Sequence, residues 1–286
     1  MNSEHHLIQS FIRQALKEDA GNGDHTSLST IPAGKQGRAK LLIKENGIIA
    51  GVAMAVKIFN EVDKHLKLDI LIEDGSKVSN GDIAFYVSGS VHSILLAERL
   101  VLNIMQRMSG IATTTRFVVN ILKDTNTKVL DTRKTTPNLR YLEKMAVKIG
   151  GGENHRFGLY DMILIKDNHV DYAGGIKKAI LASHSYLDKN YIRLPVEIEV
   201  RNLTELNEVL EIGKIDRIML DNFSFQNLKE AVKLVDKRFK TEASGGITVD
   251  NVLEYAKCGV DYVSMGALTH SVKSLDMSLK AVKNNI

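Results

Sequence analysis

Cysteine, tryptophan and proline are scarce in this chain of 286 residues, which has one cysteine, no tryptophan and three prolines. The single thiol, Cys258, cannot form an internal disulfide, and it excludes a metal site built on a Cys-x-x-Cys pair. Such cysteine usage fits a reducing compartment. Because tryptophan is absent and no basic run is interleaved with aromatic residues, we expect no nucleic-acid partner.

Long apolar segments are also missing. No stretch reaches the roughly 18 consecutive apolar residues of a membrane-spanning helix. The first 20 residues lack a basic segment followed by an apolar core, so they do not predict a secretory signal. We therefore expect a cytoplasmic protein without a membrane partner. The glycine-rich motifs of dinucleotide and P-loop sites are absent too, and no organic cofactor is expected.

The first ~110 residues combine helical and strand-like patterns. Apolar residues recur at helical spacing over 7–18, and a loop rich in glycine and asparagine follows at 20–26. A long helical stretch over 91–122 is expected to be interrupted near Ser109 and Gly110. Short β-like runs separated by turn residues lie at 39–43, 47–51, 70–72 and 83–87. The pattern predicts an N-terminal α+β unit.

The rest of the chain alternates apolar strand-like runs with helical segments. This β-α order predicts a parallel sheet with right-handed crossovers. Six or more βα units favour a TIM-like barrel, and an open doubly wound sheet is the structural alternative. The predicted strands are 128–132, 162–167, 196–200, 217–222, 241–246 and 261–266, and the predicted helices are 142–148, 176–185, 203–211, 228–239 and 249–258.

Polar residues fall where each predicted barrel strand ends. In a βα barrel these ends converge on one face, and that face holds the active site. A single charged strand end is ordinarily a solvated loop residue, but six in succession predict a site. The residues concerned are Thr132, Arg133 and Lys134; Lys166, Asp167, Asn168 and His169; Glu197 and Glu199, which alternate along 196–200, with Arg201 just after; Asp221 and Asn222; Ser244, Gly245 and Gly246; and Ser264, Met265 and Gly266.

Cations outnumber anions in this set, which predicts polyanionic ligands. An arginine fork suits a carboxylate or phosphate, and a lysine offers a compact charge. The glycines of the last two strand ends let backbone N–H groups approach a phosphate. The cations are Arg133, Lys134, His155, Arg156 and Lys166, and the expected phosphate cradle is Ser244–Gly246 with Met265, Gly266 and Ala267.

Two carboxylates, Glu199 and Asp221, leave several interpretations open. They could act as acid and base, bind a divalent metal, support a ribose hydroxyl or cationic transition state, or pair with nearby cations. His155 is interpreted as an anion contact because no second His or Cys has metal-ligand spacing. Lys166 could in principle form a Schiff base, although the crowd of cations favours anion binding.

Long motifs in both parts of the chain resemble the quinolinate phosphoribosyltransferases, also called nicotinate-nucleotide pyrophosphorylases (carboxylating). The resemblance spans nearly the whole chain, and its longest ungapped block covers 131–169. The motifs are EDAGNGDHT (18–26), AERLVLNIMQRMSGIATTT (97–115), DTRKTTPNLRYLEKMAVKIGGGENHRFGLYDMILIKDNH (131–169), EIEV (197–200), MLDN (219–222), EASGGI (242–247) and GVDYVSMGALTHS (259–271).

The resemblance implies an N-terminal α/β sandwich domain over 1–110, with the tail 270–286 packed on it. An incomplete TIM-like α/β barrel follows over 111–269. It implies a homodimer or higher homo-oligomer with shared sites, transfer of a phosphoribosyl group from phosphoribosyl pyrophosphate (PRPP) to quinolinate with loss of CO2, and Mg²⁺ bound with PRPP. The products are nicotinate mononucleotide and pyrophosphate, in de novo NAD biosynthesis.

Residue roles follow from the same motifs. Arg99 resembles the arginine that reaches the neighbour's quinolinate pocket. The carboxylate contacts are expected from Arg133, His155 and Arg156. Lys134, Lys166, Glu199 and Asp221 are the expected catalytic set: the two lysines face the donor phosphates, and the two carboxylates lie near the ribose and, indirectly, its Mg²⁺. Ser244–Gly246 and Met265–Ala267 match the 5′-phosphate cradle, and Thr132 holds the turn that aims Arg133 and Lys134.

Three other functions stay open at this point. One is a related phosphoribosyltransferase that acts on another ring acid. The several cations of the site instead favour a ring with two carboxylates as the substrate. Another is a Schiff-base aldolase that uses Lys166 on the same barrel. The last is a non-catalytic barrel that binds a phosphorylated metabolite. A relative that had lost catalysis should have lost one of the catalytic residues, but Glu199, Asp221 and both lysines are all present.

Overall fold

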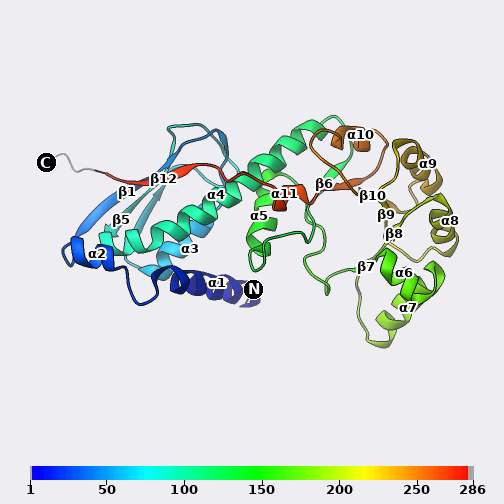
Figure 1. Cartoon of the computed structure of the whole chain (residues 1–286), viewed down its shortest axis with the longest axis horizontal. Coiled ribbons are helices and arrows are strands. Elements are labelled where there is room, and N and C mark those ends of the chain that lie inside the picture. The colour runs from blue at the N-terminus through cyan, green and yellow to red at the C-terminus, as the bar shows by residue number, and fades with distance from the viewer. Residues whose placement is uncertain (1, 283–286) are drawn as a thin grey trace. The chain divides into compact units, whose positions relative to one another are not determined.

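The computed structural model describes residues 2–282, which form two compact units. The first unit contains the described residues of Met1–Thr114, Pro137–Gly150 and Val272–Ile286. The second contains Thr115–Thr136 and Gly151–Ser271. Figure 1 shows the helices and strands of both units along the chain. The predicted domain division at residue 110 stays a prediction.

The first unit is built on an antiparallel sheet with the order β12-β1-β5-β3. The C-terminal segment supplies one edge strand of this sheet. This strand, β12, pairs with β1 so that Ala281 lies opposite Ala39 and Met277 lies opposite Ile43. The elements of this unit are α1 (Asn2–Ala20), α2 (His25–Thr30), β1 (Gln36–Ile43), β2 (Gly47–Ile48), α3 (Val52–Val62), β3 (Lys67–Ile70), β4 (Lys77–Val78), β5 (Ile83–Ser90), α5 (Arg140–Gly150) and β12 (Met277–Ala281).

Alternating side chains place the core of the first unit on one face of this sheet. Leu41 and Ile43 of β1 are fully buried, whereas the intervening Leu42 is only half-buried. Phe85 of β5 packs edge-on against Phe59 of α3, with ring centroids 6.1 Å apart. Buried aliphatic and aromatic side chains of this kind supply most of the stabilisation.

The long helix α4 (Val91–Leu122) is continuous, so the predicted interruption near Ser109 and Gly110 was wrong. Both residues serve tertiary contacts within the first unit instead. The Ser109 hydroxyl accepts from the Ala50 amide at 2.8 Å and donates to the Ala50 carbonyl at 3.1 Å. A Cβ on Gly110 would lie 2.2 Å from the Lys273 carbonyl oxygen, so only glycine permits this approach.

The predicted loop at 20–26 ends earlier than expected, because helix α2 begins at His25. Asp24 caps this helix by accepting a hydrogen bond from the Ser27 amide at 3.0 Å. The strands predicted at 47–51 and 70–72 are also displaced: β2 covers only Gly47–Ile48, and β3 ends at Ile70.

The second unit is a six-stranded parallel sheet with the order β6-β11-β10-β9-β8-β7, and all six predicted strands are confirmed. Neighbours follow chain order from β7 to β11, and β6 pairs beside β11. A doubly wound sheet would reverse its order inside the sheet, whereas this order is that of a barrel. The strands are β6 (Lys128–Leu130), β7 (Ile163–Ile165), β8 (Val196–Val200), β9 (Arg217–Asp221), β10 (Lys240–Ser244) and β11 (Tyr262–Ser264).

Within the described residues β6 and β7 do not pair, so the barrel is incomplete, which confirms the predicted fold class. No helix within residues 2–282 has the length and apolar character needed to cross a membrane. The helices of this unit are α6 (Asp167–Ala173), α7 (Ile176–Lys189), α8 (Leu203–Ile212), α9 (Phe225–Val235), α10 (Val252–Ala256) and α11 (Ala267–His270).

Candidate active site

A cavity of about 990 Å³ lies at the carboxyl ends of the barrel strands. This is the face on which βα barrels carry their sites. Its predicted members are Thr132, Arg133, Lys134, His155, Arg156, Lys166, Glu199, Asp221, Ser244, Gly245, Gly246, Gly266 and Ala267. The structure therefore brings together residues that are as much as 135 positions apart in the chain.

The turn after β6 aims two of the cations. The Lys134 amide donates to the Thr132 hydroxyl at 3.0 Å, which closes the turn that the sequence predicted. The Lys134 carbonyl accepts from the Thr269 hydroxyl at 2.8 Å. A Cβ on Gly266 would lie 2.9 Å from the Lys134 side chain, so this glycine leaves room for the lysine.

Arg156 and Arg133 are close enough to influence each other. Burial, followed by the charge of Arg133, lowers the pKa of the Arg156 guanidinium. Both groups remain charged at neutral pH, since arginine does not lose its proton in proteins. Two like charges held together without a ligand repel, and an anion in the cavity relieves that repulsion.

The two predicted carboxylates have different partners. Glu199 is nearly buried, and its Oε2 accepts a hydrogen bond from the Lys166 ammonium at 3.2 Å. Asp221 ends β9, and its Oδ2 accepts a hydrogen bond from the Asn222 side-chain Nδ2 at 2.6 Å. Both are directed at the cavity that the cations surround, so the site has a cationic wall with two carboxylates set into it.

The glycine-rich turn after β10 is shaped by its neighbour Asn222. Gly245 has φ 92° and Gly246 has φ 60°, conformations that side chains rarely adopt. A Cβ on Gly245 would lie 2.2 Å from the Asn222 Oδ1 atom. The turn therefore requires glycine both for its backbone angles and for the space beside Asn222.

Two residues with an expected substrate role, Met265 and Arg99, do not line this cavity, and neither do Asn168, His169 and Arg201 among the predicted strand-end residues. Met265 is buried, and its amide donates to the Leu130 carbonyl at 2.9 Å, so it belongs to the packing beneath Gly266. Arg99 lies on α4 within the first unit. Asp167 and Asn222, which were predicted at strand ends, line the cavity, and so do residues outside the predicted set, among which are Glu242, Thr248 and His270.

Glu242 was missed, and Glu197 was noted only because it alternates with Glu199, although strand alternation could have identified both as site residues. Glu242 lies two positions before Ser244, and Glu197 lies two before Glu199, so both pairs share the inward face of their strands. Both carboxyl side chains are fully buried. Barrel interiors are ordinarily filled by Val, Ile and Leu, so two carboxylates at this depth are unusual.

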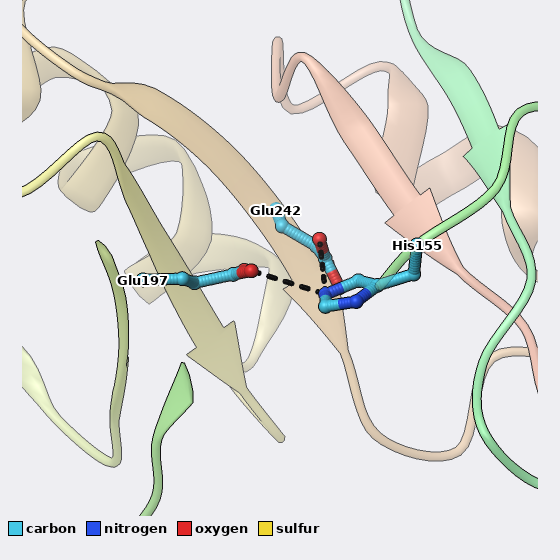
Figure 2. A group of neighbouring side chains, drawn as sticks. All are labelled: His155, Glu197 and Glu242. Carbon is cyan, nitrogen blue, oxygen red and sulfur yellow. Dashed lines mark ion pairs between the residues drawn. The ribbon is translucent and has the colours of Figure 1, made fainter. Parts of the chain in front are cut away.

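The His155 imidazole is directed at these two carboxylates, as Figure 2 shows. Its Nε2 atom lies 3.0 Å from Oε2 of Glu197 and 3.5 Å from Oε2 of Glu242. Arg217 approaches the same oxygens, at 2.9 Å from Glu242 and 3.9 Å from Glu197. The guanidinium also lies over the Tyr262 ring, 4.4 Å from its centroid.

Burial raises the pKa of both Glu197 and Glu242 to about 7. The charge of Glu197 raises the pKa of Glu242 further, whereas Arg217 opposes the rise at both residues. A carboxylate removed from water loses its hydration, and two adjacent carboxylates do not ionise together easily. The pair is therefore suited to hold one proton near neutral pH.

His155, Glu197 and Glu242 are metal-ligand residue types within reach of one cation. Arg217 already supplies a cation at 2.9 Å from Glu242. In addition, the His155 Nδ1 atom accepts a hydrogen bond from the backbone N–H of Arg156 at 2.7 Å. In a neutral imidazole this leaves the ring proton on Nε2. A protonated nitrogen cannot ligate a metal, so this cluster does not fit a metal ion.

Comparison with known proteins identifies the family of this chain. Residues 24–109 match the N-terminal domain of quinolinate phosphoribosyl transferase, and residues 111–280 match its C-terminal domain. A quinolinate phosphoribosyltransferase [decarboxylating] 1b from Nicotiana tabacum is 48% identical over 96% of this chain and 82% of its own length.

A probable nicotinate-nucleotide pyrophosphorylase [carboxylating] from Bacillus subtilis is 41% identical over 98% of this chain and 96% of its own length. The crystal structure of NadC from Streptococcus pyogenes superposes with a TM-score of 0.90 at 38% identity, and covers 96% of this chain and 97% of that one. The chain therefore belongs to the quinolinate phosphoribosyltransferase family.

Proposed function

We propose that this chain transfers the phosphoribosyl group of PRPP to quinolinate, with release of pyrophosphate and CO2, to give nicotinate mononucleotide for NAD biosynthesis. The observation that carries the proposal is the cavity itself, where Arg133, Lys134, Arg156 and Lys166 surround a space beside a glycine-rich turn. Quinolinate carries two carboxylates and PRPP carries many phosphate charges, so a pocket for both must be cationic.

The cations divide between the two substrates in this proposal. Arg133 and Arg156 offer planar forks that match the carboxylates of the ring acid. Lys134 and Lys166 face the phosphates of the donor as compact charges. The backbone of Ser244–Gly246, with Gly266 and Ala267, receives the 5′-phosphate, since glycine lets N–H groups approach it closely.

Bond formation follows from this placement. The ring nitrogen attacks C1 of the ribose while the C1–O bond to pyrophosphate breaks, and its electron pair leaves with the pyrophosphate oxygen. Positive charge develops on the ribose, and Glu199 and Asp221 stabilise it. The adduct then has a quaternary ring nitrogen beside the 2-carboxylate. This nitrogen accepts the electron pair of the breaking C–C bond, so CO2 leaves and the ring carbon takes up a proton.

Mg²⁺ is proposed to enter with PRPP. Two carboxylates, Glu199 and Asp221, suit an ion that binds through one or two carboxylates together with substrate phosphates. When bound, the ion neutralises charge on the leaving pyrophosphate. The proposed assembly is a homodimer or larger homo-oligomer in which Arg99 of a neighbouring subunit contacts quinolinate. The cytoplasmic location stays a prediction.

The purified chain tests this function when it is given quinolinate, PRPP and Mg²⁺, with nicotinate as the control acceptor. We expect nicotinate mononucleotide from quinolinate and little or none from nicotinate, which lacks one of the two carboxylates. Equal turnover of nicotinate would identify a transferase for another ring acid. A borohydride-trapped adduct on Lys166 with a carbonyl substrate would instead favour a Schiff-base aldolase.

A further inference from the structure

A left-handed bend at Asn222 brings two neighbouring side chains together where β9 ends. The φ of Asn222 is 55°, a conformation in which asparagine is among the commonest residues after glycine. In a straight continuation of the strand, the side chains of Asp221 and Asn222 would point to opposite faces. The bend instead lets Asn222 Nδ2 donate to Asp221 Oδ2 at 2.6 Å. The local backbone conformation therefore serves a contact between side chains.

The same carboxamide also lies against the glycine-rich turn that follows β10. A Cβ on Gly245 would lie 2.2 Å from Asn222 Oδ1 and 2.5 Å from Asn222 Cγ, so the turn runs directly over this side chain. The backbone amide of Asn222 donates to the Ser244 carbonyl at 2.9 Å, beside the pairing of Asp221 with Ser244. Asn222 therefore contacts two neighbouring strand ends at once, by hydrogen bonds and by packing.

These contacts leave one oxygen of Asp221 for a ligand. Asn222 occupies Oδ2, and within residues 2–282 no protein group donates a hydrogen bond to Oδ1. Asp221, Asn222 and Gly245 all line the cavity. The proposed function places the ribose at Asp221 and the 5′-phosphate at the Gly245 turn, and in PRPP a single CH2 group separates the ribose ring from that phosphate ester. The carboxylate and the turn must therefore be held at a fixed spacing.

We propose that Asn222 is a positioning residue for the transferase reaction. Its carboxamide orients Asp221 toward the ribose and, by contact with Gly245, keeps the phosphate turn in register with that carboxylate. Asn222 acts through these two neighbours and makes no bond to the reacting atoms. The inference rests on the proposed function, because a ligand that carries both a ribose and a 5′-phosphate uses the two groups together.

Asn222→Gly removes the carboxamide but keeps the bend, because glycine readily adopts a φ of 55° and retains the amide that bonds to Ser244. We expect kcat to fall about tenfold and the KM for PRPP to rise, since a charge-assisted hydrogen bond to Asp221 is lost. The KM for quinolinate should stay unchanged. Wild-type values of kcat and of the KM for PRPP would overturn this proposal, whereas a wild type that makes no nicotinate mononucleotide would overturn the proposed function itself.

Asn222→Asp distinguishes orientation of Asp221 from packing. The new side chain has nearly the same shape, but its ionised carboxylate repels Asp221 and cannot donate to it. When the two carboxyl groups share one proton, a donor is restored. We therefore expect kcat of this variant, divided by that of the wild type at the same pH, to rise as the pH falls from about 8 to about 5.5. The other charged groups of the cavity, among them Lys134, Lys166, Glu199 and His270, are common to both proteins. A ratio that does not change with pH would contradict the proposal, because packing does not depend on this proton.

A matched control and a double-mutant cycle complete the test. Asp236 also has a left-handed φ, 46°, but it ends α9 ahead of β10 and does not line the cavity, so Asp236→Gly should leave kcat and both KM values unchanged. In the Asn222→Gly background the Cβ of Gly245→Ala no longer meets Oδ1, so this substitution should raise the KM for PRPP less than it does in the wild type. Equal increases in the two backgrounds would show that Asn222 does not shape the turn and would overturn the proposed link between turn and carboxylate.

Discussion

The buried carboxyl pair should make the barrel less stable as pH rises through neutrality. Glu197 has its pKa raised by burial from 4.5 to about 7, and the unfolded chain returns it to the lower value. Between these values the folded state binds more protons than the unfolded state, so the free energy of unfolding falls with pH. The stability is fully present below about pH 4.5 and is lost as pH rises through about 7.

Glu197→Gln removes this titration and keeps the pair of Glu242 with Arg217 at 2.9 Å. A pKa that moves from 4.5 to about 7 corresponds to roughly 3 kcal/mol of unfolding free energy. Arg217, Arg156 and Lys166 already favour the charged form of Glu197, and their effect is included in that value. We therefore expect the variant to gain up to about 3 kcal/mol relative to the wild type between pH 4.5 and pH 8.

Urea unfolding followed by circular dichroism at a series of pH values measures this difference. Between about pH 4.5 and about 7 the wild type should lose stability more steeply than Glu197→Gln, while Glu254→Gln should follow the wild type because its carboxylate is exposed. Parallel curves for Glu197→Gln and the wild type over this pH range would contradict the raised pKa of Glu197. They would mean that Glu197 is ionised in the folded barrel at all these pH values.

Three further predictions concern the cavity. Arg133→Ala should raise the KM for quinolinate about 10- to 100-fold, since a charge-assisted hydrogen bond is lost, and unchanged affinity would remove Arg133 from the pocket. Gly245→Ala places a Cβ 2.2 Å from Asn222 Oδ1, at a residue whose φ is 92°. Because the turn must then distort, the KM for PRPP should rise about tenfold or more. An unchanged KM would show that the turn does not hold the donor. Arg99→Ala and Arg133→Ala can be mixed and assayed at a quinolinate concentration at which each variant alone has little activity. Mixing should restore part of the activity if neighbouring subunits share sites, and no recovery despite subunit exchange would argue against sharing.

Periodicity was sufficient to predict the barrel, because each strand is a short apolar run followed by a polar end. The same pattern identified Arg133 and Lys166 at strand ends that lie far apart in the chain. Where the pattern failed, tertiary contacts had overridden local preference. Gly110 signals a helix break by propensity, yet it is the site where the Lys273 carbonyl meets an unbroken α4.

The contacts among the buried residues of the site were harder to predict from the sequence. Glu197 and Glu242 look like ordinary charged residues, and only the closure of the strands around His155 shows that they face one another. His155 itself was predicted as an anion contact from its charge and its neighbour Arg156. A sequence does not show that its nitrogens are directed at a backbone amide and at two buried carboxylates.

Release of CO2 from quinolinate labelled in its 2-carboxylate tests the proposed reaction most directly. We expect label to be released only when PRPP and Mg²⁺ are also present, in a one-to-one ratio with nicotinate mononucleotide, because the quaternary ring nitrogen forms before CO2 departs. Release of label without PRPP, or transfer of the phosphoribosyl group with the label retained, would contradict it.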